Sequence, residues 1–196
     1  MKKILLVGST GRVGGKVKEY VLKENKHKLR VLVRNPDILE NEKDLEIVKG
    51  DIKNFEEVKK ACEGVDIIIS TLSGRKTKPD YSVLSEGIKN LIMAMKENSI
   101  KRIINLGGSG ILKDKDFGLR RNKPGYPQIF KNVSSENLKV ESLLIESNLD
   151  WTFVCAPEMP YGELTKKFRT EVNYLPGNGS RISVEDVAFY LCQILE

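Results

Sequence analysis

The chain has 196 residues, of which 40% are hydrophobic and 31% charged, a composition unlike that of collagen-like, low-complexity or intrinsically disordered chains. Three widely spaced cysteines and a single histidine argue against a disulfide framework, an ordinary zinc site and Ser-His-Asp or Cys-His catalysis, and we expect no metal. The net charge of +6 favours anionic partners such as phosphorylated cofactors, although the lysines are scattered enough to be diffuse surface charge.

Short apolar runs alternate with longer amphipathic stretches along the whole chain. In chain order, the pattern predicts a strand at residues 4–7, a helix over 13–24, strands at 29–33 and 45–48, a helix over 55–61, a strand at 65–70, a helix over 83–95, a strand at 102–106, a helix over 138–145, a strand at 151–155 and a last helix over 183–194. Ser183 and Asp186 form an imperfect capping box at the start of the last helix. Six rounds of strand and helix predict an α/β fold, a Rossmann doubly wound parallel sheet with helices on both faces.

Two segments lack a regular pattern. The basic stretch 113–123 is predicted to be a solvated loop, and residues 157–181, which contain Pro, Gly and Tyr, are predicted to form a small C-terminal substrate lobe. We expect one domain over residues 1–196, with this lobe over the carboxyl edge of the sheet, where open α/β sheets bind ligands. The first apolar run stops at Gly8, too early for a secretory signal, and no membrane-length run follows, so we expect a cytoplasmic protein.

A glycine-rich loop, Val7-Gly8-Ser9-Thr10-Gly11-Arg12-Val13-Gly14-Gly15, directly follows the first predicted strand and opens a helix. Gly8 permits a tight turn, Gly11 lets the backbone approach a diphosphate, and Gly14 lets the helix pack close to the sheet. The free N–H groups and the positive dipole end of that helix favour an anion. We therefore expect a dinucleotide to bind here, and the alternative is a glycine-rich turn without a ligand. The predicted contacts are Gly8, Ser9, Thr10, Gly11, Arg12, Val13 and Gly14.

The end of the second predicted strand indicates which dinucleotide is bound. A bare 2′-hydroxyl favours an acidic residue there, whereas a 2′-phosphate favours arginine. This chain has Arg34 directly after the strand, and Arg12 stands inside the glycine loop as a second guanidinium. We therefore expect NADP(H) to be preferred over NAD(H), the alternative being that Arg34 is only a solvated residue.

These motifs, together with Val31-Leu32-Val33-Arg34-Asn35-Pro36, Gly50-Asp51-Ile52 and Ser147-Asn148-Leu149-Asp150-Trp151-Thr152, resemble those of the atypical short-chain dehydrogenase/reductases. Within these, the chain is most similar to the NAD(P)H-binding NmrA-like and flavin/biliverdin reductase-like group, over essentially its whole length. The resemblance implies that Asp51 and Ile52 flank the adenine and that Ser70, Thr71 and Leu72 line the ribose and phosphates. It also implies that residues Gly107 to Ser109 and Ala156, Pro157 and Glu158 surround the nicotinamide.

Typical short-chain dehydrogenases use a tyrosine with a lysine four residues later on one helix face. None of the six tyrosines here has a lysine at that spacing; Tyr126 and Lys131 are one residue out of step, and prolines at 124 and 127 argue against a helix there. Ser109, after the fifth predicted strand, remains the candidate catalytic residue, able to donate a hydrogen bond to a substrate oxygen that gains charge. The alternative is that Ser109 is only a turn residue.

The leading hypothesis is an NADPH-dependent reductase of a flat conjugated acceptor, such as a flavin or a quinone, that acts as a monomer or homodimer. A redox sensor that binds NADP(H) without turnover is the first alternative, favoured by the missing Tyr-Lys pair. A sugar-type epimerase or dehydratase is the second, disfavoured because it usually needs the same tyrosine. We expect no membrane binding. We also expect no nucleic-acid binding, because the chain lacks a recognition-helix or aromatic RNA-platform pattern.

Overall fold

The computed structural model describes residues 1–39, 42, 44–74, 80–177 and 179–195. Its strands are β1 (Lys3–Val7), β2 (Lys28–Val33), β3 (Leu45–Lys49), β4 (Ile67–Ser70), β5 (Arg102–Gly108), β6 (Lys113–Asp114), β7 (Gly118–Leu119) and β8 (Asp150–Ala156). Its α-helices are α1 (Arg12–Glu24), α2 (Phe55–Cys62), α3 (Ser82–Glu97), α4 (Ile129–Glu146) and α5 (Val184–Gln193). Short 3₁₀ helices are η1 (Pro36–Leu39), η2 (Ser109–Ile111) and η3 (Arg120–Asn122).

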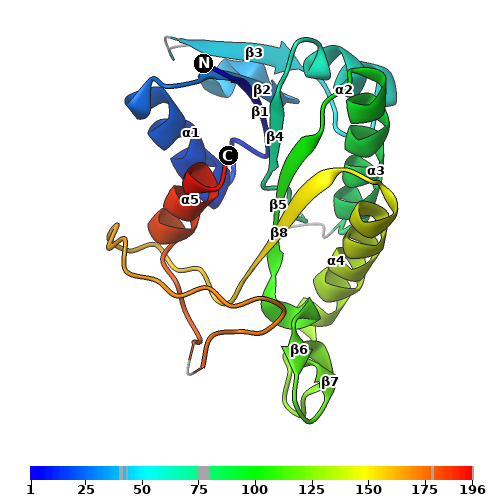
Figure 1. Ribbon diagram of the computed structural model, residues 1–196, viewed down its shortest axis with the longest axis vertical. Helices are drawn as coiled ribbons and strands as arrows, with labels where there is room; N and C mark the ends of the chain where they lie inside the picture. The colour runs from blue at the N-terminus through cyan, green and yellow to red at the C-terminus, as the bar shows by residue number, and fades with distance from the viewer. Residues whose placement is uncertain (40–41, 43, 75–79, 178, 196) are drawn as a thin grey trace.

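Six of the strands form one parallel sheet in the order β3-β2-β1-β4-β5-β8 (Figure 1). The order reverses between β1 and β4, which is the switch point of a doubly wound Rossmann sheet. The predicted α/β fold is therefore confirmed. Its strands are nearly continuous apolar runs because helices cover both faces.

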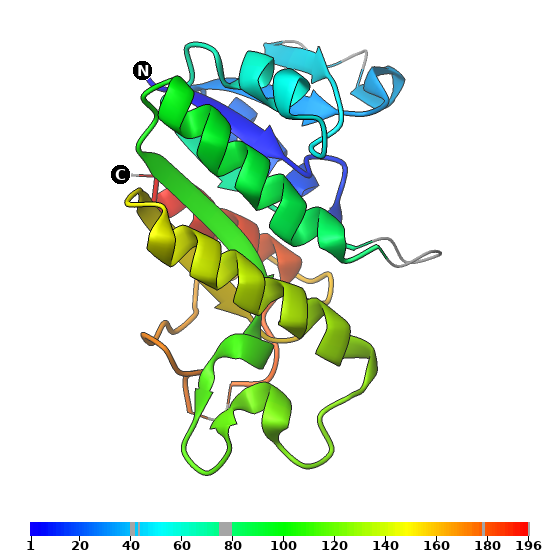
Figure 2. The same ribbon diagram turned by 90° about the vertical axis from the view of Figure 1, so that its right-hand side faces the viewer.

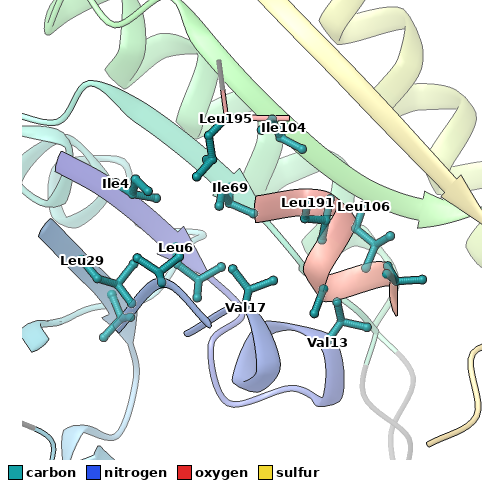
Figure 3. Packing of buried hydrophobic residues seen from close by; sticks show 14 of the residues in the cluster. Ile4, Leu6, Val13, Val17, Leu29, Ile69, Ile104, Leu106, Leu191 and Leu195 are labelled. Carbon is teal, nitrogen blue, oxygen red and sulfur yellow. The ribbon is translucent and has the colours of Figure 1, made fainter. Parts of the chain in front are cut away.

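Each face of the sheet has its own hydrophobic core. On one face α1 and α5 cover β1, β2, β4 and β5, and Figure 3 shows side chains such as Leu6, Val17, Ile69 and Leu191 meeting there. On the other face α2, α3 and α4 pack over alternate residues of the same strands, and the two views agree on this division (Figures 1 and 2). Since successive side chains of a strand point to opposite faces, one apolar run supplies both cores.

Two predictions about the region after β5 are wrong in extent. Helix α4 begins at Ile129 rather than near residue 138. The apolar pattern does not indicate its first half, because side chains buried there, such as Ser134 and Asn137, are polar. Residues 113–123 are not an unstructured loop, since β6 and β7 pair as a small antiparallel hairpin that continues into η3. The backbone N–H of Lys113 also donates to the Asn173 carbonyl at 2.8 Å, which ties this hairpin to residues 157–181.

Candidate functional site

A pocket of about 610 Å³ opens at the carboxyl ends of β1, β2, β3 and β4. Loops that follow these strands supply most of its wall. The lining residues are 7–11, 32–35, 38, 50–53, 71–74, 80 and 83. It therefore lies at the switch point of the sheet, where ligands of open α/β folds bind.

The glycine loop forms the centre of this pocket and takes the shape that its sequence predicts. Gly8 has a φ of +83°, a conformation that side chains other than glycine rarely adopt, and a Cβ there would lie 2.7 Å from the Thr71 carbonyl oxygen. A Cβ on Gly14 would lie 2.5 Å from Thr71 Oγ1 and closer still to the Gly8 carbonyl oxygen. Gly8 thus makes the turn, and Gly14 allows α1 to pack against it.

The start of α1 fits an anion. Gly11 is its N-cap in an extended conformation, so the N–H groups of the first turn have no acceptor within the helix. The helix dipole adds a partial positive charge at the same point. The Ser9 hydroxyl is buried and, within the described part of the chain, has no hydrogen-bond partner. This cradle, in which Ser9, Thr10 and the N–H groups after Gly11 meet, fits a diphosphate. Val13 contributes only backbone to it, because its side chain lies in the core.

The end of β4 supports the loop from below. Thr71 Oγ1 donates to the carbonyl oxygens of Val7 at 3.0 Å and Gly8 at 3.2 Å, so its hydroxyl holds the turn in place. Thr71 and Leu72 line the pocket, as predicted for contacts to ribose and phosphates. Ser70 does not line it; its side chain is fully buried beneath, and its Oγ has no partner among the described residues.

The two arginines expected to share the 2′-phosphate lie apart. Arg34 is exposed at the end of β2 and lines the pocket, next to Asn35. Arg12 instead points toward the lobe, where its Nη1 donates to the Met159 carbonyl at 2.5 Å and its guanidinium lies 5.7 Å from the centroid of the Tyr161 ring. The expectation that Arg12 assists Arg34 is therefore corrected, because residues distant in sequence capture its side chain.

Asp51 and Ile52, predicted to flank the adenine, both line the pocket after β3. The Asp51 N–H donates to Glu57 Oε2 at 2.6 Å, and Asp51 Oδ1 accepts from the Lys53 N–H at 3.0 Å, which fixes the carboxylate at the rim. Lys53 Nζ is neutralised by Asp80 at 2.8 Å and by Glu86 at 3.0 Å. Of the cations on this rim, Arg34 is thus the one that makes no ion pair with a carboxylate among the described residues.

The residues predicted to surround the nicotinamide meet at a neighbouring strand end rather than in this pocket. Gly107 pairs with Cys155 and Gly108 with Ala156, so β5 and β8 end side by side. Ser109 follows as the first residue of η2 and is half-buried. Pro157 continues into the lobe, where the Glu158 carboxylate accepts from Arg181 Nε at 3.2 Å.

Sequence reasoning missed a group of polar residues beside this strand end. Tyr126, Ser134 and Asn137 come from α4 and the turn before it, and they contact the glycines that follow Leu106. Helical periodicity gives no signal for polar residues that become buried through tertiary contacts. Tyr126 lies outside α4, as its flanking prolines predict, and therefore forms no helical pair with Lys131.

Among the contacts that hold residues 157–181, the lobe, against α5, one is made by a buried carboxylate. Asp186 is 4% exposed and accepts from Thr165 Oγ1 at 2.7 Å, from the Thr165 N–H at 2.9 Å and from the Lys166 N–H at 2.8 Å. The predicted capping box is thus only half formed: Ser183 Oγ accepts from the Asp186 N–H at 3.0 Å, but the carboxylate holds the lobe instead. Burial alone would raise the pKa of Asp186, yet the hydrogen bonds that the carboxylate accepts from Thr165 and Lys166 outweigh it and lower that pKa.

We expect Asp186→Asn to release the lobe and to cost about 2 kcal/mol, because an amide cannot accept from all three donors. Hydrogen exchange at the Thr165 and Lys166 amides should accelerate about tenfold or more at neutral pH.

The pKa of Asp186 is lower in the folded protein than in the unfolded chain. In the wild type, its contribution to stability is therefore present above pH ~3.9 and is lost as pH falls through the folded pKa. Glu185→Gln, which affects one exposed bond to the Gly162 N–H, is the control. Unchanged exchange in D186N would contradict the anchoring role.

The three cysteines do not supply thiolates at neutral pH. Burial raises the pKa of the thiols of Cys62, Cys155 and Cys192 to about 12, so they are protonated at neutral pH. Within the described residues, no group of three or more His, Cys, Asp or Glu side chains is placed to hold a metal ion. None of the helices that the structure describes is both long and apolar enough to span a membrane.

Comparison with known proteins agrees with this geometry. The model of a protein family described as NAD(P)H-binding matches residues 8–196. Photosystem II assembly factor Ycf39 of Cyanophora paradoxa is 33% identical over 157 residues, which are 76% of this chain and 43% of that protein. In three curated relatives, this one among them, the matched region spans only 33% to 43% of the relative's length.

Solved structures share the fold at low sequence identity. A Streptococcus pneumoniae protein provisionally described as an NADH-flavin reductase superposes with a TM-score of 0.83 at 24% identity, covering 98% of this chain and 92% of that one. ChuY of Escherichia coli O157:H7, described as an anaerobillin reductase, superposes with a TM-score of 0.81 at 22% identity, covering 98% and 89%. At these identities the likeness establishes the fold alone.

Proposed function

The chain belongs to the NAD(P)H-binding family whose model matches residues 8–196, and we propose that it is an NADPH-dependent reductase of a flat, conjugated acceptor such as a flavin or a quinone. The observation that carries the proposal is the close packing of Gly14 on Gly8, which places the start of α1, with its N-cap Gly11, at the wall of the pocket. When bound there, the dinucleotide supplies the hydride, and the protein supplies position and electrostatics.

The proposed cofactor contacts are those predicted from the sequence, with Arg12 reassigned to the lobe. The loop residues hold the diphosphate, and Asp51 accepts from the adenine amino group. Arg34 binds the 2′-phosphate, which makes NADP(H) the preferred cofactor. Its place on the pocket rim, without an ion pair to a carboxylate among the described residues, supports this. The proposed neighbours of the nicotinamide remain Gly107, Ala156, Pro157 and Glu158. The proposed place of Ser70 remains below the ribose.

The acceptor class rests on the lobe and on the names of two neighbours in fold. Tyr161 is 65% exposed with the Arg12 guanidinium beside its ring, and Tyr174 is also exposed, so the lobe offers aromatic surface to a flat molecule. Flavin and bilin, named for the two structural neighbours, are flat and conjugated. Ser109 is the proposed hydrogen-bond donor to the oxygen or nitrogen of the acceptor that gains charge.

The test is oxidation of NADPH, followed by its absorbance, with menadione, FMN and simple aldehydes as acceptors. We expect turnover with menadione or FMN, little with aldehydes, and a lower KM for NADPH than for NADH. Each rate is compared with that of Gly14→Ala, which disrupts the phosphate site and serves as the inactive control. Calorimetry with both nucleotides measures binding separately from turnover.

Two results would contradict the proposal in different ways. Tight NADPH binding without turnover across the panel would favour a redox sensor that acts on a partner protein. If no pyridine nucleotide gives binding heat or raises the melting temperature, the proposal that this pocket binds a dinucleotide is contradicted.

A further inference from the structure

Gly110 lies at a position where two hydroxyl groups leave no room for a side chain. A Cβ there would overlap both Tyr126 Oη and Ser134 Oγ. The two oxygens are 3.0 Å apart, and Ser134 Oγ also donates to the Phe130 carbonyl at 2.8 Å. Ser134 is 2% exposed, whereas Tyr126 is only half-buried. A buried serine thus holds a phenol whose ring still reaches solvent.

The same strand end carries a second polar contact from α4. A Cβ on Gly107 would lie 3.2 Å from Asn137 Oδ1, and one on Gly108 would lie 3.7 Å from Asn137 Nδ2. Three glycines around Ser109 therefore run beside polar side chains of α4 and the preceding turn, and Figure 2 shows α4 lying along the lower end of β5. Tyr126 belongs to the same strand end as the residues proposed to surround the nicotinamide.

The next serine on the helix shows that this arrangement is not a general property of α4. Ser135 Oγ donates to the Lys131 carbonyl at 3.0 Å and accepts from Arg121 Nη2 at 2.8 Å. It thus contacts η3 rather than the glycines after β5. Of these adjacent hydroxyls, only that of Ser134 meets a phenol at the strand end, and this makes Ser135 a matched control.

We infer that Tyr126 is the proton donor of the proposed reductase and that Ser134 is its positioning residue. The inference rests on the proposed function and supplies the acid that the absent Tyr-Lys pair leaves open. Because the one hydroxyl hydrogen of Ser134 goes to the Phe130 carbonyl, Tyr126 is the donor in this arrangement. Rotation of the two O–H bonds, without movement of heavy atoms, breaks the bond to Phe130 and turns the phenol proton toward the acceptor. Ser134 then donates to the phenol oxygen.

The proton balance is simple. The acceptor that receives the hydride develops negative charge on a conjugated oxygen or nitrogen. The O–H bond of Tyr126 breaks as the new bond to that atom forms, and the Ser134 hydroxyl stabilises the phenolate by hydrogen bonding. Water then returns a proton to Tyr126, whose half-buried ring leaves it within reach of solvent. One hydride and one proton are consumed for each acceptor reduced.

The experiment compares Tyr126→Phe, Ser134→Ala and Ser135→Ala with wild type. We expect Y126F to lower kcat with menadione about a hundredfold, the scale of general acid catalysis, and to leave the KM for NADPH unchanged. The loss should grow along a series of substituted quinones as the reduced form becomes a stronger base. S134A should lower kcat less, and Ser134→Thr should restore it; S135A should keep wild-type rates.

A binding measurement tests the same contact without nucleotide. Quenching of FMN fluorescence should give a Kd about threefold to tenfold weaker for Y126F than for wild type, from the loss of one hydrogen bond. S135A should bind FMN as wild type does. Similar melting temperatures would show that each variant is folded.

The inference is overturned if Y126F keeps kcat within twofold of wild type, or if S135A loses as much as Y126F. In either case NADPH turnover by wild type would leave the proposed function standing. Absence of turnover by wild type itself would overturn both, so the two failures are distinguishable.

Discussion

Gly14→Ala should destabilise the protein by about 3 kcal/mol or more and abolish measurable NADPH binding. The added Cβ would meet the Gly8 carbonyl, which is backbone and cannot rotate away, and would lie 2.5 Å from Thr71 Oγ1. Relief requires α1 to move off the loop, which separates its N–H groups from the site of the diphosphate. For a chain of this size, we expect the melting temperature to fall by about 6–12 °C.

The adjacent glycine provides the control. A Cβ on Gly15 would have the Ser9 carbonyl oxygen at 3.7 Å as its nearest neighbour, an ordinary contact. Gly15→Ala should therefore be tolerated and should stabilise α1 by up to about 1 kcal/mol through helix propensity. Equal stability and equal NADPH affinity in the two variants would show that the close approach at Gly14 is unimportant.

Arg34→Asp should weaken NADPH binding a few hundredfold and leave NADH binding nearly unchanged. The substitution removes the proposed bidentate partner of the 2′-phosphate and places a like charge beside it, whereas a carboxylate can accept from the 2′-hydroxyl of NADH. Calorimetric Kd values for both nucleotides measure the change in selectivity directly.

Two further variants make this result interpretable. Arg34→Met, which removes the charge alone, should produce an intermediate loss. Arg12→Met should preserve the preference for NADPH, because the Arg12 guanidinium contacts Met159 and Tyr161 outside the pocket. Equal loss for both nucleotides in R34D would mean that another group, such as Lys53, reads the 2′-phosphate.

The strands of the sheet and the glycine loop could be predicted from the sequence because residues close together in the chain determine both. A continuous apolar run such as Ile4-Leu5-Leu6-Val7 predicts a strand covered on both faces, and the strand is observed over Lys3–Val7. The spacing of Gly8 and Gly14 predicts a turn and a close approach, and both glycines have that geometry. These signals depend on neighbours in the chain.

Contacts between distant segments account for what the sequence does not reveal. Arg12 stands in the phosphate loop, but its partner Met159 lies 147 residues away, so no local pattern separates it from Arg34. Asp186 has the spacing of a capping residue, yet the lobe captures its carboxylate. The first half of α4 was missed because Ser134 and Asn137 are buried against glycines after β5.

The helix that begins at the phosphate loop is covered by the helix at the other end of the described chain. Val17 of α1 and Leu191 of α5 share one core, and the rings of Tyr20 and Phe189 meet edge to face at 6.4 Å. During synthesis, α1 leaves the ribosome early but remains without this cover until α5 has emerged. A nascent chain stalled before α5 would therefore expose the apolar face of α1 and depend on chaperones, since exposed apolar surface promotes aggregation. The helix that follows the glycine loop therefore gains its full packing only after α5 has been made, although the loop itself is made before α5.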